Sequence, residues 1–218
     1  GADAESSKKA IEIAEKYEGV FASVGVHPDS IFENFDETIF RDLIKHPKTV
    51  AIGECGLDWH ANNEREKQKE LFVKQVELAI ELDKPLMIHC RDAHTEVTKI
   101  FKNYKMQFGD KLRGDIHFFT GSIKEAEEYM DLGFSFSFTG VITFTDSYNE
   151  VIKFLPLEKI MIETDAPFVA PVLYRGKRCE PLYAREVAKR IAELKLIDYD
   201  KVAAVTTANA VKLFNLPM

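Results

Sequence analysis

The chain has 218 residues, and 45% of them are hydrophobic, so it can bury a sizeable core and is neither disordered nor fibrous. We therefore expect one domain over residues 1–218. The formal net charge of −7 argues against a protein that coats nucleic acid non-specifically, because phosphate backbones reward clustered lysine and arginine.

Apolar periodicity predicts strands that alternate with helices along the whole chain. Clear helix signals support this reading: Phe72, Val76 and Ala79 form one apolar stripe, and Ser122 with Glu125 fits a capping box. Asp92 is expected to cap another helix. In chain order we expect a helix over 5–17, a strand over 20–26, a helix over 38–44, a strand over 49–53, a helix over 63–82, a strand over 85–89, a helix from Asp92 to Tyr104, a strand over 114–118, a helix that opens at Ser122 and ends before Gly133, a strand over 134–138, a helix over 147–155, a strand over 160–163, and helices over 182–194 and 199–214.

Strands joined by helical crossovers must be parallel, which leaves an open doubly wound sheet or a closed barrel. Polar residues at several separate strand ends favour the barrel, because closure gathers all the ends around one point. The sequence supplies six such strands, however, whereas a TIM-like (β/α) barrel has eight. We therefore expect an α/β TIM-like barrel whose first two strands are absent from this chain.

Four residues that bind hard metal ions are expected where apolar, strand-like runs end. They are Glu54, His89, His117 and Asp165. Taken singly, each has a simpler explanation, such as a hydrogen-bonded core histidine or a carboxylate that shapes a turn. Together they suit one or two divalent ions that accept nitrogen and oxygen ligands, namely Mg²⁺, Mn²⁺ or Zn²⁺. Such ions lower the pKa of bound water from about 16 towards about 7.

Other polar residues near strand ends are expected to serve the same chemistry. His27 ends the first strand and could touch metal or substrate, and Arg91 follows His89. Arg175, Lys177 and Arg178 form a basic cluster after the last strand, where barrels commonly hold phosphate. The alternative for this cluster is a solvated loop. We expect substrate to be bound by Arg91, Arg175, Lys177 and Arg178.

Cysteine content and hydropathy indicate a compartment. Cys55, Cys90 and Cys179 are odd in number and scattered, so they form no disulfide framework and are expected to be small buried hydrophobes. No apolar run approaches the length of about 20 residues that a membrane span needs. We expect a cytoplasmic protein without a membrane partner, as a monomer or weak oligomer.

The motifs resemble those of the TatD-type metal-dependent hydrolases, in the amidohydrolase-like group of barrels. The resemblance runs over essentially the whole chain in the family's order: Val24-Gly-Val-His-Pro28, Gly53-Glu-Cys-Gly-Leu-Asp58, Ile88-His-Cys-Arg-Asp-Ala93, His117-Phe-Phe-Thr-Gly-Ser122, Glu163-Thr-Asp-Ala-Pro-Phe168 and Arg175-Gly-Lys-Arg-Cys-Glu-Pro181. It implies a TIM-like barrel that hydrolyses DNA with divalent metal, often from the 3′ end.

The resemblance also implies a role for each matched residue. Glu54 matches a carboxylate that bridges two metals, His89 and His117 match the histidines of one metal, and Asp165 matches the aspartate at the other. His27 matches a histidine implicated in activity. Glu54, Asp165 and His27 are therefore the expected catalytic residues, and the substrate would be single-stranded DNA or DNA 3′ ends.

One family motif is missing, because the chain has no His-x-His pair of the kind that opens the family. Either a segment preceding Gly1 belongs to the native protein, which we favour because unpaired strand edges are a liability, or the chain is truncated. Two other functions stay open. One is a metal-dependent ester or amide hydrolase, such as an aminoacyl-tRNA deacylase. The other is a catalytically dead metal-binding module.

Overall fold

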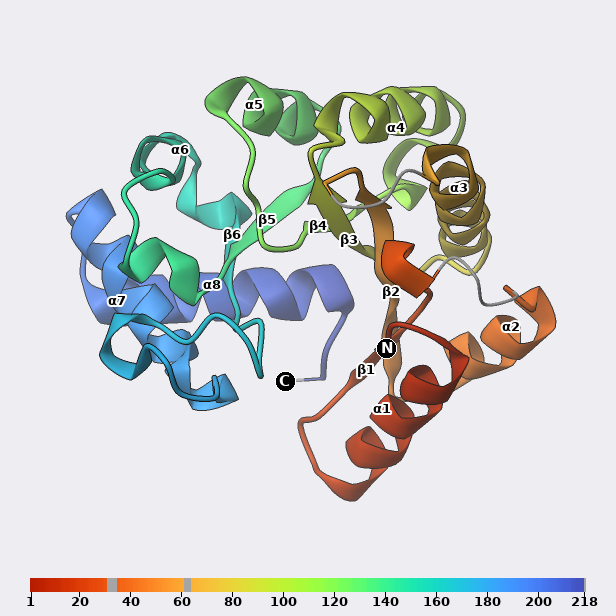
Figure 1. Cartoon of the computed structure of the whole chain (residues 1–218), viewed down its shortest axis with the longest axis horizontal. Coiled ribbons are helices and arrows are strands. Elements are labelled where there is room, and N and C mark those ends of the chain that lie inside the picture. The colour runs from red at the N-terminus through yellow and green to blue at the C-terminus, as the bar shows by residue number, and fades with distance from the viewer. Residues whose placement is uncertain (31–34, 61–63, 218) are drawn as a thin grey trace. The chain divides into compact units, whose positions relative to one another are not determined.

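Helices and strands alternate along the chain in the computed structural model (Figure 1), which describes residues 1–30, 35–60 and 64–217. The elements are α1 (Ala4–Lys16), β1 (Ala22–Val24), α2 (Glu37–Lys45), β2 (Thr49–Asp58), α3 (Arg65–Glu81), β3 (Leu86–Arg91), α4 (His94–Phe108), β4 (Gly114–Ile116), α5 (Ile123–Asp131), β5 (Ser135–Phe138), α6 (Asn149–Phe154), β6 (Ile160–Ile162), α7 (Ala184–Lys195) and α8 (Tyr199–Phe214). Within the described residues, six strands form a sheet in the order β1-β2-β3-β4-β5-β6. The expected alternation of helices and strands is confirmed.

Residue contacts divide the chain into two units, Gly1–Asp115 and Ile116–Met218. In the first unit β1, β2 and β3 pair in parallel, and helices α1, α2 and α3 contact the β1 and β2 strands. The expected stripe on α3 is confirmed, because Phe72, Val76 and Ala79 are buried. Asn63, the first residue expected for that helix, lies outside the described residues. The single domain over 1–218 stays a prediction.

Aromatic side chains build the core of the second unit. Phe119, Tyr129 and Phe136 are buried, and the Phe119 and Phe136 ring centroids lie 4.9 Å apart. Around them β5 pairs in parallel with β6, and α8 contacts β6. The Ser122–Glu125 capping box is confirmed at the start of α5, where each side chain accepts a backbone N–H from the other residue.

Several expectations about where elements begin and end are wrong. Strand β2 does not end at Glu54 but continues to Asp58, because its pairing with β3 resumes after a register shift between Ile52 and Cys55. Likewise β3 runs two residues beyond His89. Asp92 does not cap α4, whose N-cap residue is Ala93 without a side-chain hydrogen bond. The Asp92 carboxylate instead lies 2.9 Å from Nδ1 of His60.

Two further observations concern the cysteines and the possibility of a membrane-spanning helix. Cys55, Cys90 and Cys179 are free and buried, as expected. Burial raises the pKa of the Cys55 thiol well above its usual range, so this residue is an inert core side chain. Among the described residues, the structure has no helix with the length and apolarity needed to cross a membrane.

Candidate metal centre

The pairing of β2 with β3 brings Glu54 and His89 together in the first unit. Gly56 is the register partner of His89, which places Glu54 two residues before that pair on the neighbouring strand. His27 follows β1 and precedes a short 3-10 turn at Pro28–Ser30. Neighbouring parallel strands thus supply one functional side chain each, within or just after the strand.

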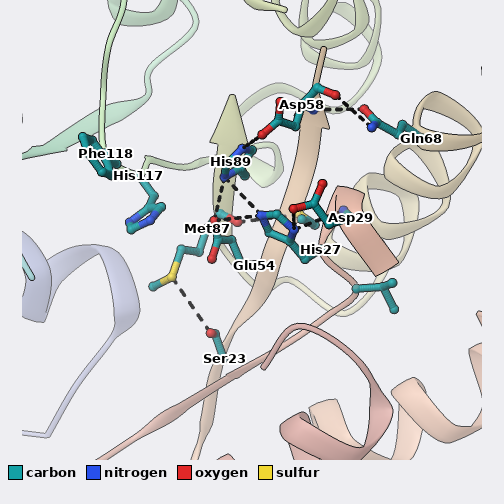
Figure 2. A network of polar contacts seen from close by, with 12 residues as sticks. Ser23, His27, Asp29, Glu54, Asp58, Gln68, Met87, His89, His117 and Phe118 are labelled. Carbon is teal, nitrogen blue, oxygen red and sulfur yellow. Dashed lines mark hydrogen bonds and ion pairs between the residues drawn. The ribbon is translucent and has the colours of Figure 1, made fainter. Parts of the chain in front are cut away.

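Figure 2 shows the three side chains turned toward one another. Oε1 of Glu54 lies 2.9 Å from Nδ1 of His89 and 3.5 Å from Nε2 of His27. Nε2 of His27 lies 3.2 Å from Nδ1 of His89. One carboxylate oxygen and two ring nitrogens therefore lie within 4.8 Å of one another, a set of donors that suits a divalent ion such as Zn²⁺ or Mn²⁺.

His89 lies between two carboxylates (Figure 2). Its Nδ1 faces Glu54, and its Nε2 lies 3.0 Å from Oδ2 of Asp58. Desolvation alone would lower the pKa of His89, but the hydrogen bonds and charges of Glu54 and Asp58 outweigh it and raise the pKa above the usual value. The pocket around this ring therefore favours positive charge.

His27 has a different hydrogen-bonding environment. The backbone N–H of Asp29 donates to Nδ1 of His27 at 3.1 Å. Because that nitrogen accepts, the proton of the neutral ring is on Nε2, where it faces Glu54 and His89. With the proton on Nε2, His27 is suited to donate a proton or hydrogen bond, and it would join Glu54 and His89 as a ligand only by losing that proton.

Asp58 was not singled out from the sequence. It is buried, and its Oδ1 atom accepts the backbone N–H of His60 at 2.9 Å. A signal did exist, because strand alternation places residue 58 on the same face as Glu54, and an aspartate in an otherwise buried strand requires a partner. Gln68 was also missed, since nothing in its helical position distinguishes it from its polar neighbours.

His117 lies in the second unit directly after β4, with 11% of its side chain exposed. Its Nδ1 atom lies 2.5 Å from Oε2 of Glu163, and the other carboxylate oxygen of Glu163 accepts the Phe118 N–H and the Ser137 hydroxyl. Desolvation would raise the pKa of Glu163, but His117, Ser137 and Phe118 together hold it below its usual value. Glu163 is thus an ionised partner of His117.

The remaining expected site residues lie on strand ends and loops. Asp165 follows β6 and is partly buried, and its carbonyl oxygen accepts the Phe168 N–H. Arg91 ends β3 and is exposed. Three further cations lie exposed in the loop before α7, namely Arg175, Lys177 and Arg178. The Arg175 guanidinium lies 3.9 Å from the Phe144 ring centroid, and Nε of Arg178 lies 3.9 Å from Glu180.

Comparison with known proteins gives one consistent match. The sequence model described as "TatD related DNase" matches residues 1–215. An uncharacterized metal-dependent hydrolase of Bacillus subtilis, YabD, is 39% identical over 99% of this chain and 86% of its own length. A protein of Citrobacter koseri named 3′-5′ ssDNA/RNA exonuclease TatD is 34% identical over 99% of this chain and 86% of its own length.

Comparison with solved structures gives a match to the same family. The crystal structure of YjjV, a TatD homologue from Escherichia coli K12, matches with a TM-score of 0.92 and 28% identity. The match covers 100% of this chain and 85% of YjjV. The expected fold class, that of the TIM-like α/β barrels, is thereby confirmed. The chain belongs to the TatD family of metal-dependent hydrolases.

Proposed function

We propose that this hydrolase cleaves the phosphodiester bonds of DNA, as an exonuclease that acts on single strands from their 3′ ends. The observation that carries the proposal is the convergence of Glu54, His89 and His27 within 4.8 Å. The name of the Citrobacter relative, a 3′-5′ exonuclease of single-stranded DNA and RNA, supports the substrate class.

Glu54 and His89 would hold a divalent ion, because Oε1 and Nδ1 already face each other at 2.9 Å. The family motifs assign His117 to the same ion, Asp165 to a second, and a bridging role to Glu54. Mg²⁺, Mn²⁺ and Zn²⁺ all accept such oxygen and nitrogen ligands to different degrees. The bound ion would supply a water of lowered pKa and would polarise the phosphoryl oxygen.

The other side chains would move protons and hold phosphate. His27, with its Nε2–H directed at Glu54, would donate a proton or hydrogen bond, and Asp165 would accept the proton of the attacking water. Arg91 and the exposed loop cations Arg175, Lys177 and Arg178 would bind the substrate backbone. A cytoplasmic location and a monomeric or weakly oligomeric state complete the proposal.

A nuclease assay on 3′-end-labelled single-stranded DNA, with added Mg²⁺ or Mn²⁺, tests the proposal. We expect release of labelled mononucleotide by the wild type. Glu54→Gln should lose this activity while its circular dichroism spectrum is unchanged. The exposed Glu70 on α3 offers a matched control, and Glu70→Gln should cleave as the wild type does.

Three outcomes would contradict the proposal. Full activity of Glu54→Gln would show that the Glu54 carboxylate is not needed for cleavage. Hydrolysis of an aminoacyl ester in a parallel assay, without cleavage of DNA, would identify an ester hydrolase instead. Bound metal, shown by elemental analysis, without turnover of either substrate would identify a metal-binding module.

A further inference from the structure

Asp58 is a buried carboxylate for which the proposed ligand set has no role. We propose that Asp58 is a positioning residue, which holds the His89 ring so that Nδ1 is presented to a divalent cation beside Glu54. This inference rests on the proposed metal-dependent function and adds to it a residue that acts through a ligand. It predicts that the cation affinity depends on a side chain that the cation does not touch.

The contact between Asp58 and His89 fixes the position of a proton. Oδ2 of Asp58 lies 3.0 Å from Nε2 of His89, and a carboxylate oxygen accepts a hydrogen bond from a ring N–H. Nε2 therefore keeps its proton when a cation takes the lone pair of Nδ1, the ring nitrogen that lies 2.9 Å from Glu54. The carboxylate thus selects both the tautomer and the orientation of the ring.

Asp58 is itself held in place by two neighbouring segments. Its side chain is 9% exposed, and its Oδ1 atom accepts the His60 N–H at 2.9 Å. Its backbone N–H donates to Oε1 of the buried Gln68, while Nε2 of Gln68 donates to its carbonyl oxygen, both at 2.9 Å. Gln68 belongs to α3, so a helix anchors the strand end that carries Asp58 (Figure 2).

A purely structural carboxylate would show a different pattern of effects. If Asp58 served stability alone, its removal would lower the unfolding free energy and leave cation affinity and ring geometry unchanged. Removal of a positioning residue would instead change the tautomer and the orientation of the His89 ring. In Asp58→Asn the side-chain amide can offer either oxygen or N–H to the ring, so Nε2 protonation is no longer enforced. Loss of such a partner typically weakens metal binding by about 10- to 100-fold.

The test measures Zn²⁺ and Mn²⁺ binding to the full chain by isothermal titration calorimetry. We expect Asp58→Asn to bind about 10- to 100-fold more weakly than the wild type. The control is Asp92→Asn, because Asp92 is exposed, lies near the same strand ends and pairs with His60. Its affinity should equal that of the wild type.

A second measurement uses the metal-free protein and does not depend on whether an Asp58 variant folds. Proton NMR of the metal-free wild type should show a downfield ring N–H that exchanges slowly with solvent. Its loss in His89→Gln would assign the signal to that ring. Its absence from the wild type would overturn the proposal, as would unchanged metal affinity in a folded Asp58→Asn protein. If the wild type binds metal but cleaves no DNA, the proposed function fails while this inference stands.

Discussion

Nδ1 of His117 lies 2.5 Å from Oε2 of Glu163, so a histidine pairs with a carboxylate in the second unit as well as in the first. In the first unit one such pair is His89 with Asp58, at 3.0 Å. Partners of this kind fix the tautomer and orientation of a histidine and increase its basicity. Glu163 is thus the shared partner of His117, the Ser137 hydroxyl and the Phe118 N–H.

The first prediction concerns the stability of the second unit. Glu163→Ala removes the acceptor shared by His117, the Ser137 hydroxyl and the Phe118 N–H. We expect the free energy of unfolding to fall by about 1.5–3 kcal/mol, the range for hydrogen bonds to charged groups. Urea denaturation measures the loss. Glu158→Ala, at an exposed position of the same unit, should change stability little, and equal losses in both variants would contradict the assignment.

The second prediction concerns metal and thermal stability. A ligand that binds only the folded chain stabilises it by about 2.7 kcal/mol when its concentration is one hundred times Kd. Mn²⁺ or Zn²⁺ should therefore raise the Tm of the wild type, and excess chelator should reverse the shift. Glu54→Gln should show little or no shift, because the carboxylate nearest Nδ1 of His89 has lost its charge. A full shift in this variant would mean that the ions bind elsewhere.

The third prediction concerns the close approach of β2 to β3 at Gly56. A Cβ atom there would overlap the His89 carbonyl oxygen, and φ is 149°. We expect Gly56→Ala to lose about 1–3 kcal/mol through backbone strain, with a further loss from the overlap, and to bind metal more weakly because His89 is displaced.

Gly19 provides the matched control for this substitution. Its φ is 75°, and a Cβ there would meet nothing within 4 Å, so Gly19→Ala carries strain without overlap. It should lose less stability and keep its metal affinity. Gly56→Ala would contradict the prediction if both its unfolding curve and its titration curve matched those of Gly19→Ala.

The fourth prediction concerns the pH dependence of an ion pair between α3 and α4. Nζ of Lys69 lies 2.7 Å from Oε1 of Glu96, and the hydrogen bond with Lys69 lowers the pKa of Glu96. A carboxyl whose pKa is lower in the folded state contributes stability above its unfolded pKa. That contribution disappears as the pH falls through the folded pKa.

Glu96→Gln should therefore be less stable than the wild type at neutral pH. The pair is partly exposed, so the difference should be about 0.2–1 kcal/mol. In acid, below the usual glutamate range, the two unfolding free energies should converge. Urea denaturation across this pH range checks the sign, and a difference that grew as the pH fell would refute it. Glu70→Gln, at an exposed position on α3, should show no such trend.

Periodicity and the motifs in the sequence were enough to predict the alternating helices and strands, the capping box at Ser122 and the family. They also singled out Glu54, His89 and His27, since each is a ligand-type residue beside an apolar run. The residues at which helices and strands begin and end were less predictable. Nothing local shows that β2 resumes pairing after the register shift at Ile52, so Glu54 lies inside a strand that was expected to end there.

The amino-acid sequence by itself determined which side chains are available for chemistry and on which kind of element each one lies, because helix and strand periods are local properties. Tertiary structure alone decided the hydrogen-bond partners that join one element to another. Asp58 meets His89 across two strands, Gln68 reaches Asp58 from a helix, and Asp92 turns to His60 instead of capping α4. These contacts depend on how strands pair and helices pack, which the periodicity of any single segment does not specify.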